Sequence, residues 1–202
     1  MDARKDRLIE LLLLRSFQYS ENPPFVLASG KTSPYYINCK PVTLHPEGLN
    51  LIGALGYEHA KRLGVTAVGG LTLGADPIAC AIASHSHARS KPMQAFVVRK
   101  VAKGHGLDRW IEGELPPGTP VAVLDDVLTT GASTISAIER AREAGLQVED
   151  AIVLVDREQG GREAVQAYGV QVHAMITLSE LMARRTAAQT HAKELGEPVP
   201  VA

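Results

Sequence analysis

The chain has 202 residues, of which 45% are apolar and 21% charged, with 21 basic and 22 acidic side chains and a formal charge of −1. This composition excludes collagen-like, disordered and disulfide-scaffold proteins and is typical of a single globular domain. The near-zero charge and a pI of about 6.7 indicate no general attraction to nucleic acid or to a membrane surface. Any anion-binding site must therefore come from local groups.

The sequence predicts a cytoplasmic protein. The longest apolar run near the start, residues 8–14, is interrupted by Glu10 and is too short to span a bilayer. No small-residue cleavage site follows this run, which argues against a secretory signal. Cys39 and Cys80 are far apart and match no metal or redox motif, which fits a reducing compartment. We expect both cysteines to be buried.

The first 45 residues predict a small substructure ahead of the main body. Residues 3–15 have the apolar spacing of an amphipathic helix. Two short strands are expected at residues 25–27 and 35–37, with glycine and proline turns between them. We call residues 17–45 the hood and expect it, with the N-terminal helix, to lie beside the main body.

Strands and helices alternate through the rest of the chain. This alternation predicts right-handed crossovers and an α/β fold with a mostly parallel, doubly wound sheet. We expect one domain over residues 1–202, with a core at about 46–180 and a C-terminal helix and tail at 179–202. The expected strands are 65–68, 95–98, 121–124, 151–155 and 170–176, and the expected helices are 47–63, 76–88, 131–144, 161–168 and one from 179.

The segment 121–134 has the pattern of a phosphate-binding turn. An apolar strand leads to Asp125 and Asp126, and a turn rich in glycine and hydroxyl groups then opens a helix. Backbone N–H groups at a helix N-terminus, with a glycine that allows close approach, bind a phosphate monoester. The two carboxylates would repel that phosphate but suit ribose hydroxyls or a hydrated Mg²⁺ beside it. The residues of this cradle are Val127, Leu128, Thr129, Thr130, Gly131, Ala132 and Ser133.

Two other interpretations of this segment are possible. It can be an ordinary strand end followed by a helix cap, although the combined pattern makes this the weaker choice. It can also be the acidic strand of a nucleotide triphosphatase, but that requires a Walker A loop. The only Gly-Lys-Thr sequence is at residues 30–32, and Phe25 stands where the first glycine of such a loop would be.

A basic segment follows the expected strand at 95–98. Four basic residues and a single acidic one, Asp108, lie within residues 99–109 of a chain that is otherwise slightly acidic. Glycines and a Pro-Pro pair up to residue 119 predict a long mobile loop, and long loops in compact domains are usually functional. The other interpretation is a solvated surface loop. We expect Trp110 to anchor this loop and not to stack on a ligand.

The run from Val121 to Thr134 closely resembles the phosphoribosyl diphosphate (PRPP) motif of type I phosphoribosyltransferases. Three further segments resemble the orotate-specific members of that family, and the resemblance extends over about residues 8–180. These segments are Leu27 to Asn38 in the hood, Arg99 to Gly106 in the basic segment, and Asp156-Arg157.

The resemblance implies a transfer of the phosphoribosyl group from PRPP to orotate, as used in pyrimidine (UMP) synthesis, with Mg²⁺ as cofactor. It implies that Mg²⁺ is bound mainly through PRPP, near Asp125 and Asp126. It also implies a homodimer in which the 99–119 loop reaches the neighbouring subunit's site. The implied PRPP-binding and catalytic residues of the loop are Arg99, Lys100, Lys103 and His105, with Lys103 the main catalytic cation, and the cradle with both aspartates completes the PRPP site. The implied orotate contacts are Thr129, Arg157, Tyr36 and Ile37.

Two positions depart from the family pattern. Many orotate-specific members have a lysine at the positions of Ala28 and Gly74. Lys31 can replace the first by reaching over from a nearby turn, and the loop at Gly74 can bind diphosphate through its backbone N–H groups.

Two other functions are consistent with the same fold. A purine-base phosphoribosyltransferase would have no carboxylate for Arg157 to bind. A PRPP-sensing regulator without catalysis would not need Lys100 and Lys103, and it would more often carry a basic surface for nucleic acid.

Overall fold

The computed structural model describes residues 2–26, 32–101 and 110–195. At its centre is a six-stranded sheet with the strand order β10-β9-β8-β5-β6-β7. Neighbouring strands from β10 to β6 are parallel, and β7 pairs antiparallel with β6 at one edge. The predicted α/β fold with a mostly parallel sheet is therefore confirmed. The strands are β5 (Ala67–Leu71), β6 (Gln94–Val98), β7 (Ile111–Glu112), β8 (Pro120–Leu128), β9 (Gln147–Asp156) and β10 (Gln171–Thr177).

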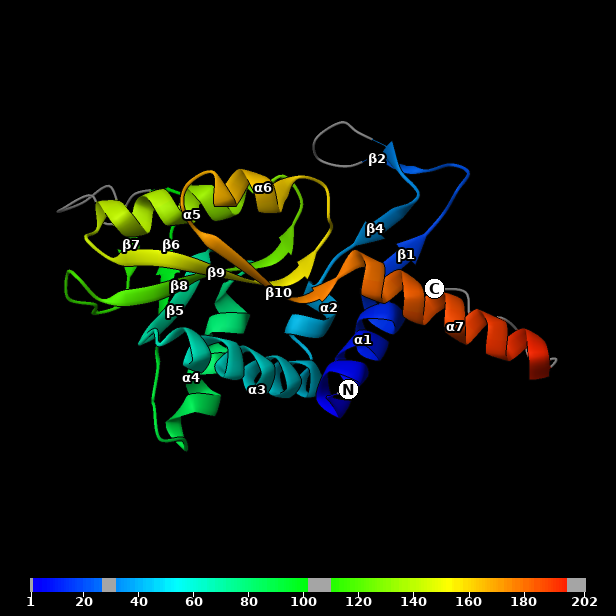
Figure 1. Ribbon diagram of the computed structural model, residues 1–202, viewed down its shortest axis with the longest axis horizontal. Helices are drawn as coiled ribbons and strands as arrows, with labels where there is room; N and C mark the ends of the chain where they lie inside the picture. The colour runs from blue at the N-terminus through cyan, green and yellow to red at the C-terminus, as the bar shows by residue number, and fades with distance from the viewer. Residues whose placement is uncertain (1, 27–31, 102–109, 196–202) are drawn as a thin grey trace.

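Helices cover both faces of this sheet, with α5 and α6 on one face and α3 and α4 on the other (Figure 1). Each face buries its own apolar cluster, and the central strands β8 and β9 contribute to both clusters. Burial on two sides explains their nearly continuous apolar sequences. The helices are α1 (Ala3–Arg15), α2 (Lys40–Thr43), α3 (Pro46–Leu63), α4 (Asp76–His87), α5 (Ala132–Glu143), α6 (Gly161–Gln166) and α7 (Leu178–Leu195).

The hood consists of two small antiparallel pairs and the short helix α2. Strand β1 (Phe17–Tyr19) pairs with β4 (Tyr35–Ile37), and β2 (Phe25–Val26) pairs with β3 (Thr32–Ser33). Asp126, near the end of β8, contacts Lys40 of this region, and Arg157, directly after β9, contacts Ser33 and Tyr35. The hood therefore lies over the carboxyl ends of the parallel strands, which is where ligands bind in such sheets.

Several boundaries differ from the sequence prediction. Strand β5 begins two residues later than predicted, and it also ends later because Gly69 and Gly70 belong to the strand and not to a turn. A Cβ at Gly69 would lie 2.0 Å from the carbonyl oxygen of Phe96, so only glycine lets the two strands approach this closely. Strand β8 also runs beyond the predicted end at residue 124 and includes both aspartates.

The predicted loop at 99–119 is not entirely irregular. Residues 111–112 form β7, which pairs with the end of β6. The prediction that residues 99–119 form a loop was therefore wrong at residues 111–112. A strand of two residues is too short to give a recognisable apolar pattern. Residues 102–109, which include Lys103 and His105, lie outside the described residues.

The prediction for the cysteines was correct for one of the two. Cys39 is buried, whereas Cys80 on α4 is exposed. The buried stripe of α4 consists of Ile78, Ala79, Ile82 and Ser86, and Cys80 lies off that stripe. None of the described helices is long and apolar enough to cross a membrane.

Candidate active site

The predicted phosphate cradle lies where β8 gives way to α5. Gly131 forms the N-cap of α5 with φ of +85°, a left-handed conformation that favours glycine. A Cβ at this position would also lie 3.0 Å from the carbonyl oxygen of Gly161. The turn therefore places the N-terminus of a twelve-residue helix directly after Thr129 and Thr130. This is the arrangement that binds a phosphate monoester.

The two aspartates before the cradle have different surroundings. Asp125 is 7% exposed and accepts hydrogen bonds from Ser133 Oγ at 2.6 Å and Thr134 Oγ1 at 2.7 Å. Burial raises the pKa of the Asp125 carboxyl, and these two hydrogen bonds act in the opposite direction. Asp125 thus ties the end of β8 to the first turn of α5 and fixes the shape of the cradle.

Asp126 lies on the wall of a cavity. Its Oδ1 accepts a hydrogen bond from the Val127 N–H at 3.1 Å, and its Oδ2 lies 3.5 Å from Lys40 Nζ. Gly74, in the connection between β5 and α4, approaches the same carboxylate. A Cβ at Gly74 would lie 2.5 Å from Asp126 Oδ1, so a larger residue at this position would displace the carboxylate.

The cavity has a volume of about 510 Å³ and lies between the hood and the carboxyl ends of β8 and β9. Thr129 and Thr130 of the cradle are on one part of its wall, and Tyr36, Ile37 and Arg157 are on another. The four residues that the resemblance assigns to orotate are thus brought together beside the cradle. The full lining is Val26, Tyr36, Ile37, Asn38, Cys39, Lys40, Asp126, Val127, Thr129, Thr130 and Arg157.

Arg157 is a buried cation in this wall, with 4% of its surface exposed. Its Nη2 donates hydrogen bonds to Ser33 Oγ at 3.2 Å and to the Tyr35 carbonyl at 3.3 Å. Its Nε is buried and has no partner within the described ranges. Burial lowers the pKa of the Arg157 guanidinium, because the protein supplies little compensation for its lost hydration. An anionic ligand in the cavity would supply the counter-charge that these neutral partners do not.

The described part of the basic segment lies away from this cavity. Arg99 Nη1 pairs with Glu112 at 2.7 Å, and Lys100 is exposed. Neither side chain is among the described residues of the cavity wall. The other two predicted loop cations, Lys103 and His105, lie in the range 102–109 that the structure does not describe.

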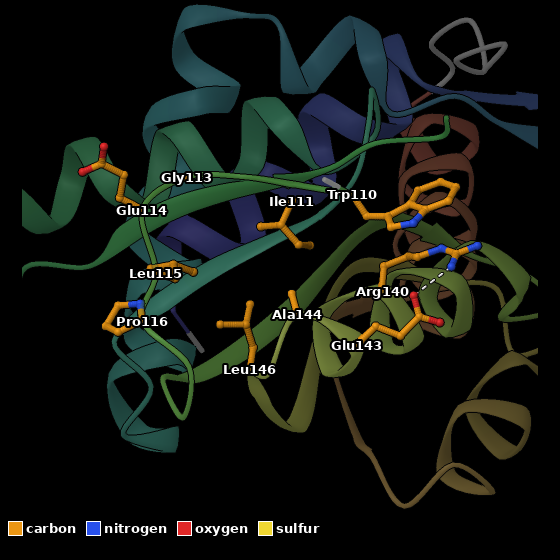
Figure 2. Close-up of a pocket in the computed structure, with 10 residues that line it drawn as sticks. All are labelled: Trp110, Ile111, Gly113, Glu114, Leu115, Pro116, Arg140, Glu143, Ala144 and Leu146. Carbon is orange, nitrogen blue, oxygen red and sulfur yellow. Dashed lines mark hydrogen bonds and ion pairs between the residues drawn. The ribbon is translucent and has the colours of Figure 1, made fainter. Parts of the chain in front are cut away.

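A second, larger cavity of about 940 Å³ lies between residues 110–116 and the C-terminal half of α5 (Figure 2). Within it, the Arg140 guanidinium lies 3.7 Å from the centre of the Trp110 ring and pairs with Glu143 at 2.8 Å. The Trp110 carbonyl accepts a hydrogen bond from the Arg99 N–H at 2.8 Å. Trp110 thus packs on Arg140 of α5 and is tied through its carbonyl to Arg99, as expected for an anchor.

The sequence interpretation missed Cys39 and Lys40. These residues directly follow the recognised segment that ends at Asn38, and no spacing pattern distinguishes them from an ordinary loop. In the folded chain, Cys39 and Lys40 at the start of α2 contact Asp126 of β8. The Cys39 thiol donates to the carbonyl oxygen of Asp126 at 3.6 Å, which brings Lys40 to the cavity.

No family model matches the chain. It is, however, 49% identical over 178 residues to the orotate phosphoribosyltransferase of Aquifex aeolicus, covering 88% of this chain and 97% of that protein. The chain belongs to the orotate phosphoribosyltransferase family. The resemblance of the sequence to type I phosphoribosyltransferases is therefore confirmed over most of the chain.

Solved structures agree with this assignment. The orotate phosphoribosyltransferase of Mycobacterium tuberculosis H37Rv in complex with PRPP has a TM-score of 0.73 and 35% identity, covering 88% of this chain and 98% of that one. An adenine phosphoribosyltransferase from Leishmania tarentolae has a TM-score of 0.61 but only 15% identity, covering 85% of this chain and 88% of that one, so it shares the fold alone.

Proposed function

We propose that the chain transfers the 5-phosphoribosyl group of PRPP to orotate and releases orotidine 5′-monophosphate and diphosphate. The observation that carries this proposal is Arg157. It is a buried cation whose Nε has no partner among the residues that the structure describes, and it shares one cavity with a phosphate cradle. Orotate carries a carboxylate that a guanidinium binds in a bidentate manner.

In this proposal the two substrates occupy neighbouring parts of the cavity and the cradle. The 5-phosphate lies in the cradle at residues 129–133, the ribose hydroxyls lie over Asp126, and orotate lies between the hood and Arg157. A ring nitrogen of orotate then forms the bond to the anomeric carbon as diphosphate leaves with the electrons of the broken bond, and the proton of that nitrogen passes to the departing diphosphate or to water. No general base is required of the chain. Positioning of the two substrates and stabilisation of the leaving charge supply the catalysis.

We also propose that the reaction depends on Mg²⁺, bound mainly through PRPP. When bound, the ion supplies positive charge that neutralises the diphosphate oxygens. Asp126 suits a hydrated ion because its carboxylate lines the cavity. Asp125 is less suited, because its Oδ2 already accepts hydrogen bonds from Ser133 and Thr134 of α5. Within the described ranges there is no group of three or more His, Cys, Asp or Glu residues able to hold a metal alone.

The basic segment completes the proposed site. Arg99, Lys100, Lys103 and His105 are assigned to the diphosphate, and we propose a homodimer in which residues 99–119 serve the neighbouring subunit's cavity. Arg99 pairs with Glu112 and is not among the described residues that line the cavity of its own chain, which supports this arrangement. We place the protein in the cytoplasm, which its two free cysteines support.

The test is the loss of orotate absorbance when purified protein is mixed with orotate, PRPP and Mg²⁺, with adenine, hypoxanthine and uracil as parallel substrates. We expect consumption of orotate alone, dependent on both PRPP and Mg²⁺. Turnover of a purine base would favour the purine enzyme. Binding of PRPP without turnover of any base would favour the regulator, and either result would contradict the proposal.

A further inference from the structure

Lys40 is a cation of the cavity wall to which no role has been assigned. It is the first residue of α2, and its ammonium lies 3.5 Å from Asp126 Oδ2. About half of the Lys40 side chain is exposed, whereas the Asp126 side chain is 15% exposed. A pair this long and this exposed contributes little to stability. The ammonium can therefore leave Asp126 for a stronger anion at small cost.

The charges of the cavity wall make Lys40 important for an anionic substrate. Among the described lining residues, Lys40 and Arg157 are the two cations and Asp126 is the one carboxylate. Arg157 is fixed by its hydrogen bonds to Ser33 and to the Tyr35 carbonyl. Lys40 is thus the cation of this wall that is free to follow a ligand.

Two elements approach the Asp126 carboxylate. Gly74, between β5 and α4, brings its backbone so close that a Cβ there would lie 2.5 Å from Asp126 Oδ1. Lys40 of α2 lies 3.5 Å from the other oxygen, Oδ2, and brings a cation to it.

We propose that Lys40 binds the diphosphate end of PRPP, leaving Asp126 when the ribose hydroxyls take its place. This inference rests on the proposed function. In PRPP the diphosphate is attached in the α configuration, on the same face of the ring as the 2- and 3-hydroxyls. If Asp126 accepts those hydroxyls, its carboxylate lies next to the diphosphate. The Lys40 ammonium, which pairs with Asp126 in the free protein, then lies next to the diphosphate as well. The 5-phosphate at the other end of the ring is served by the cradle.

The test compares Lys40→Met, which keeps the aliphatic stem, with Lys40→Arg, which keeps the charge. One charge-assisted hydrogen bond corresponds to about tenfold in affinity or more. We expect Lys40→Met to raise the KM for PRPP and the dissociation constant of inorganic diphosphate, measured by calorimetry, by about that factor. Lys40→Arg should restore most of both. The KM for orotate and the affinity for orotidine 5′-monophosphate, which lacks the diphosphate, should be unchanged.

Lys91→Met is the matched control, because Lys91 is exposed in the turn after α4. Unchanged diphosphate affinity in Lys40→Met, tighter PRPP binding, or an equal loss for orotidine 5′-monophosphate would overturn the inference. Lys40→Gln gives the same comparison if the Met variant does not fold. A wild-type protein that binds diphosphate but does not consume orotate would contradict the proposed function alone, since diphosphate affinity still tests Lys40.

Discussion

Replacement of Lys103 by alanine is expected to lower turnover by orders of magnitude while leaving the fold intact. Diphosphate gains negative charge as its bond to the sugar breaks, and a cation at that place stabilises the transition state more than the ground state. Loss of one such group typically lowers kcat by about 10² to 10³. The measurement is kcat for orotate consumption at saturating PRPP, with the far-ultraviolet circular dichroism spectrum as the check on folding.

Lys91→Ala provides a control for the loss of a surface lysine. Near-normal kcat in Lys103→Ala would show that this cation is not central to the reaction. The same variant tests the shared loop when it is mixed with Arg157→Ala. Activity is measured at an orotate concentration well below the KM of Arg157→Ala, where both single variants are nearly inactive. If the loop serves the neighbouring subunit, each mixed dimer contains one intact site, and up to about a quarter of wild-type activity should return. If the loop serves its own subunit, the mixture should show only the low average activity of the two variants.

Arg157→Ala is expected to raise the KM for orotate by about 100-fold, with PRPP binding little changed. The expected size follows from removing a bidentate, charge-assisted contact to a carboxylate at a water-poor site, worth about 3 kcal/mol. Arg157→Lys should restore little of it, because a lysine cannot reproduce the two parallel hydrogen bonds. The measurement is steady-state kinetics with each substrate varied in turn.

Arg157→Met is the matched variant, since it retains part of the side-chain volume against Tyr35 while it removes the charge. It should have the same selective defect for orotate as the alanine variant. Equal losses for orotate and PRPP would count against a role in the base pocket. They would instead indicate that Arg157 mainly holds the hood through Ser33 and Tyr35.

The alternation of strands and helices predicted the sheet and most of its elements, because buried parallel strands and amphipathic helices have distinct apolar periods. The boundaries were less certain where other residues interrupt that pattern. Gly69 and Gly70 ended the predicted strand early, although the close approach to Phe96 requires glycine inside it. The aspartates were likewise placed beyond β8 because charged residues rarely occur within buried strands.

The candidate site was predictable in its local motifs and not in its long-range contacts. The cradle is a contiguous segment, so its glycine and hydroxyl pattern was visible in the sequence. The sequence did not show that Asp125 binds Ser133 and Thr134 while Asp126 lines the cavity, because this depends on which of two adjacent side chains faces α5. Lys40 is 86 residues from Asp126 in the chain, and no local pattern indicates that they meet.

The central claim is that one cavity binds the phosphate in the cradle and the orotate carboxylate at Arg157. A crystal structure of the protein with orotidine 5′-monophosphate tests it most directly. We predict the phosphate on the N–H groups of residues 129–133 and the carboxylate within hydrogen-bond distance of Arg157. Binding with the carboxylate away from Arg157, or in the cavity beside Trp110, would contradict the account.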